Sequence, residues 1–351
     1  MSLYTELSNT AQTAYAQLVD ATLSAEHLRS VADLSGSFAA KTVKGHKYWY
    51  YQYTEPSGKL RQVFVGPDND GVRALIEQRK VKPSAAKALE PLARSAEVLG
   101  CAPVLPRHFR VVRRLAEYGF FQAGGVLIGT HAFLAYGNML GVHWGDASRT
   151  QDIDSAHAGK SLSLALSSNI EVQTHDAIQS LQMGFLPISG LSSKAGGTCL
   201  IPQEPGFRLD FLTSLHRGGE KPYEHKQLHV TLQPLKFMEF SLEQVQQTVL
   251  FCNEGAVVVN IPHPLRYALH KVLIFGEREG AFAVKAGKDL RQAASLLSYF
   301  KEHRAWEIEE TWNDLLARGK GWATRAQRGV KVLDKGFPAL CLHDLLQLSD
   351  H

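Results

Sequence analysis

The spacing of apolar and polar positions changes several times along the 351-residue chain. Leu and Ala recur at helical spacing over residues 3–34, which predicts one or two helices. Residues 41–68 instead carry aromatic and β-branched residues on both sides of "EPSG", a pattern typical of a β-hairpin with a short turn. Helices are predicted again over about 70–99, with interruptions at Pro83 and Pro91 because proline removes a helix hydrogen bond.

The middle of the chain reads as a mixture of strands and helices. A basic helix is predicted from residue 107, then a buried strand at "GGVLIG" and a helix at "THAFLAYGNMLG". Further strands are expected at 149–156, 198–202, 207–215, 226–235 and 256–262. After Pro264 the pattern is mostly helical, with breaks expected at Gly319, Gly321 and Gly336. This order predicts an α+β protein with a mixed sheet in three parts: an N-terminal helical and β-hairpin module (1–103), a core (104–262) and a C-terminal helical domain (263–351).

Composition excludes several classes of protein. Hydrophobic residues make up 44% of the chain and charged residues 21%, which are ordinary values for a globular protein and exclude disordered and collagen-like chains. Four widely spaced cysteines give neither a zinc pattern nor a disulfide framework, so a reducing, cytoplasmic location is expected. The start of the chain lacks the basic and apolar regions of a signal peptide. The apolar run at 124–142 contains glycines and polar residues, and we interpret it as a core strand and helix, with no membrane contact.

Two carboxylates one residue apart are the first candidate for chemistry. In "RTQDIDSA" (149–156), a strand would project Asp152 and Asp154 from the same face. Neighbouring carboxylate oxygens are ligands that Mg²⁺ prefers, and Mn²⁺ is the alternative ion. A polar strand end or turn is the competing explanation, because Asp is common there without any ligand.

Two other segments fit the same chemistry. In "LIGTHAF", Gly129 and Thr130 lie between a strand and a helix, where free amides and the helix dipole favour a phosphate; a plain turn is the alternative. In "RLDFLTS", Asp210 stands between apolar neighbours, where an unpaired carboxylate is costly to bury. A third metal ligand would account for Asp210, and so would an ion pair with Arg208 or another base.

Taken in order, these segments resemble the DNA-polymerase-β-like nucleotidyltransferase superfamily. Its pattern is an apolar strand, Gly-Gly or Gly-Ser, a helix, then Asp-x-Asp or Asp-x-Glu, and a third Asp on a neighbouring strand. The resemblance implies that Asp152, Asp154 and Asp210 hold two metal ions, with Gly129 and Thr130 on the nucleoside triphosphate (NTP). The chain departs from the pattern in having Thr130 in place of serine, and in a longer gap before the Asp pair.

The closer resemblance is to bacterial nucleotidyltransferase-like families around the AbiEii-type toxins. Arg149 and the Asp pair of "RTQDID" match their R-x-[ST]-x-D-[IL]-D segment, and "HPLRYALHKVLIFGERE" with "KAGKDLRQA" resembles their helical region. By that resemblance Arg149 lines the nucleotide site, Lys271 binds triphosphate, and Lys288 and Asp289 lie nearby, with Asp289 as a candidate general base. Gln292 stands where these families often have another Asp, and a helix-surface salt bridge is the competing explanation for Asp289.

The predicted hairpin carries aromatic residues among cations. Tyr48 and Tyr50 alternate near Lys44, Lys47, Lys59 and Arg61, a combination that suits single-stranded bases and phosphates. Together with the basic helix at 107–114, the hairpin would present an RNA or DNA end to the NTP site. The competing explanation is one packed face of a small sheet whose lysines protect an edge.

The sequence therefore predicts an Mg²⁺-dependent nucleotidyltransferase that transfers a nucleoside monophosphate from NTP to an acceptor hydroxyl, on RNA or tRNA as the toxin relatives imply. Two alternatives stay open at this point. One is a protein-modifying or small-molecule nucleotidylyltransferase with a purely structural hairpin. The other is a catalytically silent nucleotide-binding module.

Overall fold

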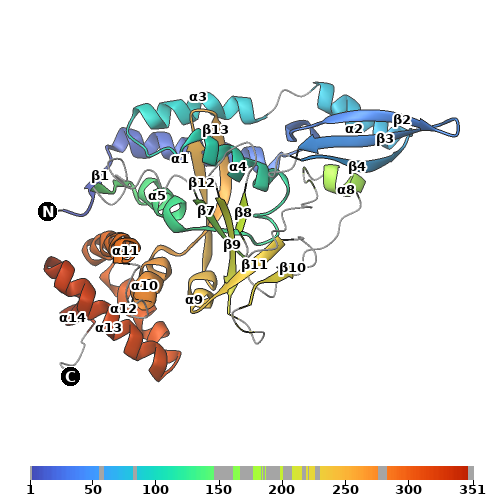
Figure 1. Ribbon diagram of the computed structural model, residues 1–351. Helices are drawn as coiled ribbons and strands as arrows, with labels where there is room; N and C mark the ends of the chain where they lie inside the picture. Colours follow the sequence, from blue (N-terminus) through green and yellow to red (C-terminus); the bar gives the residue numbers. More distant parts are fainter. Residues whose placement is uncertain are drawn as a thin grey trace.

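The protein is an α+β structure, as the sequence predicts, in which several small sheets and a C-terminal group of helices surround a central sheet (Figure 1). The computed structural model describes residues 2–54, 59–81, 85–145, 161–166, 177–182, 184, 186, 198–200, 208–215, 219, 221–225, 230–275 and 283–346. No described helix is long and apolar enough to cross a membrane.

The N-terminal part combines two long helices with a separate sheet. Its helices are α1 (Asn9–His27), the 3-10 turn η1 (Val31–Asp33), α2 (Asp70–Val81) and α3 (Ala85–Val98). The α1 helix begins at Ser8, whose hydroxyl accepts the Ala11 amide and so caps the helix. Pro91 lies inside α3, so the predicted interruption there is wrong, whereas Pro83 falls outside the described residues.

The predicted hairpin is part of a three-stranded antiparallel sheet, β2 (Ser37–Val43), β3 (His46–Thr54) and β4 (Leu60–Pro67). The sequence analysis missed β2. Lys44 and Gly45 both have positive φ, the conformation of a two-residue turn between antiparallel strands. The "EPSG" turn at 55–58 lies outside the described residues. In Figure 1 the far end of β2 and β3 extends away from the rest of the molecule.

The central sheet has the strand order β10-β11-β9-β7-β5, with β8 also paired to β9. It is mixed, because β5 is antiparallel to β7 whereas β7, β9 and β11 run parallel. Its strands are β5 (Val126–Ile128), β7 (Ser161–Leu166), β8 (Thr198–Leu200), β9 (Arg208–Ser214), β10 (Tyr223–His225) and β11 (Val230–Leu235). The helices of this part of the chain are α4 (Pro106–Glu117), α5 (Gly129–Leu140), α8 (Ala177–Gln182) and α9 (Met238–Leu242). Helices α5 and α9 contact the central sheet, whereas α8 contacts β4 of the small sheet. A two-stranded pair joins β1 (Thr5–Glu6) to β6 (Val142–His143).

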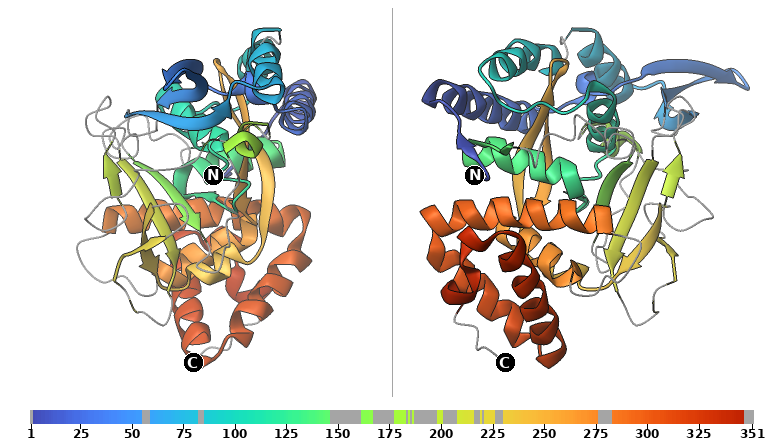
Figure 2. Two further views of the ribbon diagram at one scale, coloured as in Figure 1. Left: turned by 90° about the vertical axis from the view of Figure 1, so that its right-hand side faces the viewer. Right: turned by 60° about the vertical axis from the view of Figure 1, so that its left-hand side comes forward.

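A long hairpin links the N-terminal helices to the C-terminal ones. It consists of β12 (Val245–Cys252), which the sequence analysis missed, and β13 (Gly255–Pro262). Side chains of α1 and α3 pack on one side of it, where the fully buried Leu18 of α1 and Ala93 of α3 share a core cluster with Val249 of β12. Figure 2 shows β12 and β13 running between this helical layer and the C-terminal helices. β13 also contacts β5, so the hairpin supports the start of the central sheet.

The C-terminal part is helical, as predicted. Its elements are α10 (Pro264–Phe275), α11 (Ala283–His303), α12 (Ala305–Ala317), α13 (Lys320–Gly336), η2 (Pro338–Leu340) and α14 (Leu342–Leu345). Gly319 separates α12 from α13 and Gly336 ends α13, as predicted, but Gly321 lies inside α13. Helix α10 contacts α11, α12 and α13, which makes it the centre of this group.

One close helix contact yields a stability prediction. A Cβ atom on Gly329 of α13 would lie 2.2 Å from the Val272 carbonyl oxygen of α10. Because that neighbour is backbone, Gly329→Ala must separate the two helices, and overpacking of this kind costs about 1–3 kcal/mol. Urea unfolding of the full chain measures the loss. Gly336→Ala is the matched control, since its Cβ meets nothing within 4 Å. Equal stability of Gly329→Ala and the wild type would contradict the close contact.

Candidate functional site

The turn between β5 and α5 is the starting point of the candidate site. Gly129 has φ of +69°, in the left-handed region that favours glycine, and the preceding Ile128 is extended. No side chain caps the N-terminus of α5, and Gly129 and Thr130 are only partly buried. The first amides of α5 and the positive end of its dipole are therefore suited to an anion beside Thr130.

The segment leading into β5 is held by hydrogen bonds from β13. The buried Asn260 amide nitrogen donates to the carbonyls of Phe121 and Gly125, at 2.7 and 2.9 Å. Gly125 also packs directly on the Phe120 ring, where a Cβ would lie 2.1 Å from a ring carbon. These contacts fix the approach to β5, and with it the position of the Gly129 turn.

A tyrosine from α10 holds the turn from the other side. The Tyr267 hydroxyl lies 2.9 Å from the Gly129 carbonyl oxygen and 3.0 Å from the Gln292 side-chain amide on α11. The amide atom that the hydroxyl meets is Gln292 Oε1, an acceptor, and because a phenol has one proton the hydroxyl donates either to it or to the Gly129 carbonyl oxygen at any moment. Burial raises the pKa of Tyr267 well above its ordinary value, which keeps the phenol protonated and able to donate.

An ion pair between two helices lies beside this tyrosine. The Lys271 ammonium group on α10 pairs with the Asp289 carboxylate on α11, and their side chains are only 11% and 15% exposed. The same ammonium group lies 4.8 Å from the centre of the Tyr267 ring, within reach of a cation–π interaction. The sequence analysis offered a salt bridge on the surface of one helix as the competing explanation for Asp289. The structure instead shows a salt bridge between two helices that is mostly buried.

Two histidines connect the start of α5 to α4. The His131 Nε2 atom, one residue after Thr130, lies 2.8 Å from the Nδ1 atom of His108, and both side chains are buried. Burial, His108 and the positive charge of Lys288 lower the pKa of His131 to about 3, in that order of importance. His131 is therefore neutral near pH 7, and Lys288 of α11 contributes positive potential at this end of α5.

Asp210 lies on the strand two places from β5. Ile128 is aligned with Ser163 of β7, and Ser163 with Asp210 of β9, so Ile128 and Asp210 share a face of the sheet. On that face Ile128 packs with Met238 of α9 and with Leu212. The partly buried Asp210 carboxylate thus lies on the face and at the end of the sheet where α5 begins.

The structure brings some predicted site residues together and leaves others undescribed. Gly129, Thr130, Lys271, Lys288 and Asp289 gather at the β5–α5 turn through the contacts above. Arg149, Asp152 and Asp154 lie outside the described residues, so one of the three predicted carboxylates, Asp210, is described. Within the described ranges, no group of three or more His, Cys, Asp and Glu side chains is arranged to hold a metal ion.

The sequence analysis gave no role to the connecting residues Tyr267, Gln292 and His108. Helical spacing could have indicated two of them. Tyr267 lies four residues before Lys271 and Gln292 lies four residues after Lys288, so each pair shares a helix face. His131, buried against His108, is a packed histidine of the core.

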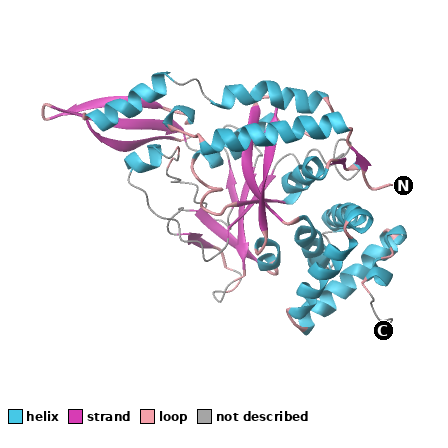
Figure 3. Ribbon diagram, turned by 180° about the vertical axis from the view of Figure 1, so that it is seen from behind, coloured by secondary structure: helices cyan, strands magenta, loops and turns pink. Residues whose placement is uncertain are grey.

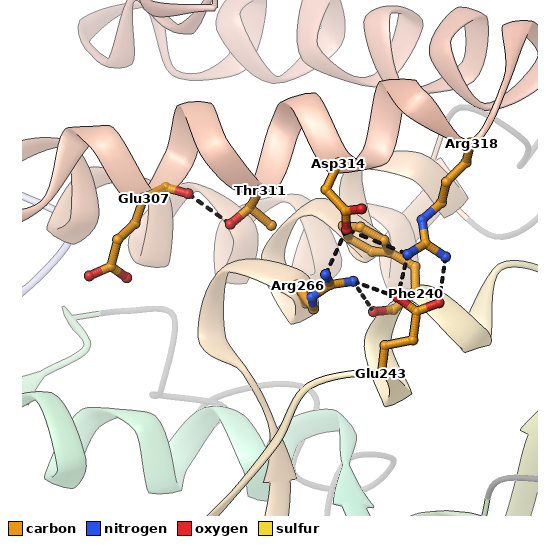
Figure 4. A network of polar contacts seen from close by, with 7 residues as sticks. All are labelled: Phe240, Glu243, Arg266, Glu307, Thr311, Asp314 and Arg318. Atoms are coloured by element: carbon orange, nitrogen blue, oxygen red, sulfur yellow. Dashed lines mark hydrogen bonds and ion pairs between the residues drawn. The ribbon is translucent and has the colours of Figure 1, made fainter.

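Charged residues fix the helix that carries Tyr267 and Lys271. Figure 4 shows Arg266, at the start of α10, between Glu243 next to α9 and Asp314 of α12. Its guanidinium lies 3.1 Å from Glu243 and 2.6 Å from Asp314, and Arg318 also pairs with Glu243. Both arginines stack on the Phe240 ring. This network therefore fixes the start of α10 between α9, which contacts the central sheet, and α12.

Comparison with known families supports a nucleotidyltransferase, the coarser part of the resemblance found in the sequence. A family model described as Nucleotidyltransferase matches residues 107–317, from α4 to the end of α12. The match contains the central sheet, the Gly129–Thr130 turn and the paired helices α10 and α11. Neither the curated proteins nor the solved structures include a significant match. Because residues 107–317 make up more than half of the chain, the protein belongs to this nucleotidyltransferase family.

Proposed function

We propose that the protein transfers a nucleoside monophosphate from NTP to an acceptor hydroxyl on RNA, tRNA included, in an Mg²⁺-dependent reaction. The observation that carries the proposal is the uncapped start of α5, with its Gly129–Thr130 turn, next to the Lys271–Asp289 pair, inside a family-model match for nucleotidyltransferases. The acceptor hydroxyl gives up its proton to solvent and its oxygen bonds to the α-phosphorus, while the bond from that phosphorus to the bridging oxygen breaks and pyrophosphate leaves with the electron pair.

The triphosphate is assigned to the cations and amides around the turn. Thr130 and the first amides of α5 bind phosphate oxygens, and Lys271 and Lys288 add positive charge from the neighbouring helices. Arg149 joins this set by resemblance alone. Asp289 is assigned as a positioning residue for Lys271, because its carboxylate is already engaged in the ion pair; this replaces the general-base role considered from the sequence.

The metal ligands proposed are Asp152, Asp154 and Asp210. Among the three, Asp210 is the one that the structure describes, and its position supports the assignment. Its carboxylate, a hard oxygen donor of the kind that Mg²⁺ prefers, lies on the sheet face and at the sheet end where α5 begins. Bound there, Mg²⁺ or Mn²⁺ would neutralise charge on the phosphates and lower the pKa of the acceptor hydroxyl. The role of Asp210 also includes accepting a hydrogen bond from that hydroxyl.

Replacing Tyr267 with phenylalanine tests the support of the phosphate turn. The change removes the donor to the Gly129 carbonyl, a hydrogen bond worth about 0.5–1.5 kcal/mol. We expect NTP to bind roughly two- to tenfold more weakly, measured as the Kd of a fluorescent NTP analogue. Tyr299→Phe on α11 is the control, since the contacts described for Tyr299 are ring contacts. Unchanged NTP affinity of Tyr267→Phe would contradict the assignment of the turn to phosphate.

Acceptor screening tests the proposed reaction. Purified protein is incubated with Mg²⁺, each α-labelled NTP in turn, and either total bacterial RNA or a protein lysate, beside an Asp152→Ala/Asp154→Ala variant. Label entering RNA with the intact pair alone supports the proposal. Label entering protein would replace RNA by a protein acceptor, and NTP binding without any transfer would leave a silent nucleotide-binding module.

A further inference from the structure

The small sheet β2–β4 has one face in the core and one directed outward. Along β3 the side chains alternate, and Tyr51 and Tyr53 are 0% and 3% exposed. Tyr48 and Tyr50 therefore lie on the opposite face. Phe64, the β4 partner of Tyr50 in the register, is 48% exposed. The outward face thus holds aromatic side chains that the core does not use.

These outward rings form a connected surface. The centre of the Phe64 ring lies 6.1 Å from that of Tyr48 and 5.5 Å from that of Tyr50. The Lys41 ammonium group of β2 lies 4.7 Å from the centre of the Tyr50 ring. We call Lys41, Tyr48, Tyr50 and Phe64 the aromatic platform. Rings beside a cation offer stacking for bases and an ion pair for phosphate.

The described strands of this sheet carry charged residues of one sign, and the acidic Asp68 follows directly after β4. Residues 37–54 and 59–67 contain Lys41, Lys44, Lys47, Lys59 and Arg61 and no Asp or Glu. Both ranges are described, and all four lysines are exposed. A polyanion is therefore the partner whose charge complements this sheet.

The other basic element, helix α4, is already engaged within the protein. Arg110 pairs with Glu254, Arg113 lies 3.5 Å from Glu117, and Arg114 donates to the Thr54 carbonyl at 2.9 Å. Of the hairpin and the helix, to which the sequence analysis gave the presentation of a nucleic acid together, the hairpin is the element considered as the binding surface. The contact to Thr54 also ties the end of β3 to α4, and α4 reaches the start of α5 through His108 and His131.

We infer that the aromatic platform binds a single-stranded segment of the acceptor RNA, with bases stacked on Tyr48, Tyr50 and Phe64 and phosphates on Lys41. The inference rests on the proposed function for the choice of RNA. Figures 1 and 3 show the sheet as an arm that projects from the rest of the molecule, with the Lys44–Gly45 turn at its far end. RNA bound on the platform therefore reaches the candidate site by extending along the arm toward the central sheet. A duplex hides its base faces, so single strands are preferred.

Fluorescence anisotropy on the full chain without NTP or Mg²⁺ tests this inference. The probes are a labelled mixed-sequence 12-nucleotide RNA, its duplex, and the corresponding single-stranded DNA. We expect the single-stranded RNA to bind most tightly, and Tyr50→Thr/Phe64→Thr to bind it about tenfold more weakly or worse, since two stacking rings are lost. Thr preserves strand propensity, and Trp306→Ala, which removes an exposed ring on α12, is the control.

A second variant keeps the test decisive if the double variant fails to fold. Lys41→Gln changes one exposed side chain and should lower the slope of log affinity against log salt by about one, whereas Lys335→Gln on α13 should not. Wild-type RNA affinity in both platform variants would overturn the inference, and so would a preference for duplex or for DNA. Transfer of nucleotide to RNA by a variant with wild-type RNA affinity would overturn the platform and leave the proposed function standing. RNA binding that depends on the platform, without any nucleotide transfer, would support the platform and overturn the proposed function.

Discussion

Asp210→Asn should abolish most nucleotidyl transfer while the protein stays folded. The change keeps the size of the side chain and removes one negative charge from the sheet face where α5 begins. Loss of one electrostatic contact to a developing charge typically costs on the order of 10²–10³-fold in rate. We therefore expect a loss of this size in kcat, measured as label transferred from α-labelled NTP, with higher Mg²⁺ needed for half-maximal rate.

The control for this prediction is Asp20→Asn, which removes an exposed carboxylate from α1, away from the candidate site. It should transfer nucleotide at the wild-type rate. Circular dichroism and the thermal midpoint establish that Asp210→Asn is folded. A folded Asp210→Asn protein with near wild-type kcat would remove Asp210 from the reaction.

The second large effect concerns the pair of Lys271 and Asp289. Lys271→Met removes the cationic partner of a carboxylate that is 15% exposed. Breaking a buried ion pair on one side costs about 3–5 kcal/mol, and the partial exposure here places the expected loss near the lower end of that range. The variant should also lose transfer activity, because the same ammonium group is assigned to the triphosphate.

A double variant separates these two effects. In Lys271→Met/Asp289→Leu both charges are gone, so much of the lost stability should return, as found when apolar groups replace a buried ion pair. Activity should not return, because no cation faces the phosphates from α10. Urea unfolding and the transfer assay read the two quantities independently. Recovery of wild-type kcat in the double variant would mean that Lys271 acts only in folding.

Helices and strands could be predicted where the residues within one short segment show a clear pattern of apolar and polar positions. The change from alternating aromatic residues to helical spacing located β3, β4 and α2, and the apolar run before "THAF" located β5 and α5. Strand β2 was not predicted because Ala39, Ala40 and Lys41 in its centre have weak strand propensity, and because its pairing with β3 depends on the Lys44–Gly45 turn. Pro91 did not break α3, because tertiary contacts of the fully buried Ala93 and Ala96 outweigh its local cost.

The candidate site divides in a similar way. Gly129, Thr130, Lys271 and Asp289 could be proposed as site residues from the sequence, because their residue types suit phosphate or proton chemistry and their positions match the family resemblance. Contacts across helices could not, since nothing local says that the Tyr267 hydroxyl reaches the Gly129 carbonyl 138 residues earlier. The ion pair of Lys271 with Asp289, rather than a surface pair within α11, likewise depends on how α10 packs on α11.

The most direct test of nucleotidyl transfer is to follow the two ends of the triphosphate separately. Purified protein, Mg²⁺ and total RNA are incubated with NTP labelled either on the α- or on the γ-phosphate, and both the RNA and the released product are counted. Transfer of a nucleoside monophosphate predicts α-label in RNA and γ-label in pyrophosphate, in equal amounts. Entry of γ-label into the acceptor, or release of γ-label as inorganic phosphate alone, would contradict nucleotidyl transfer and indicate phosphoryl transfer or hydrolysis.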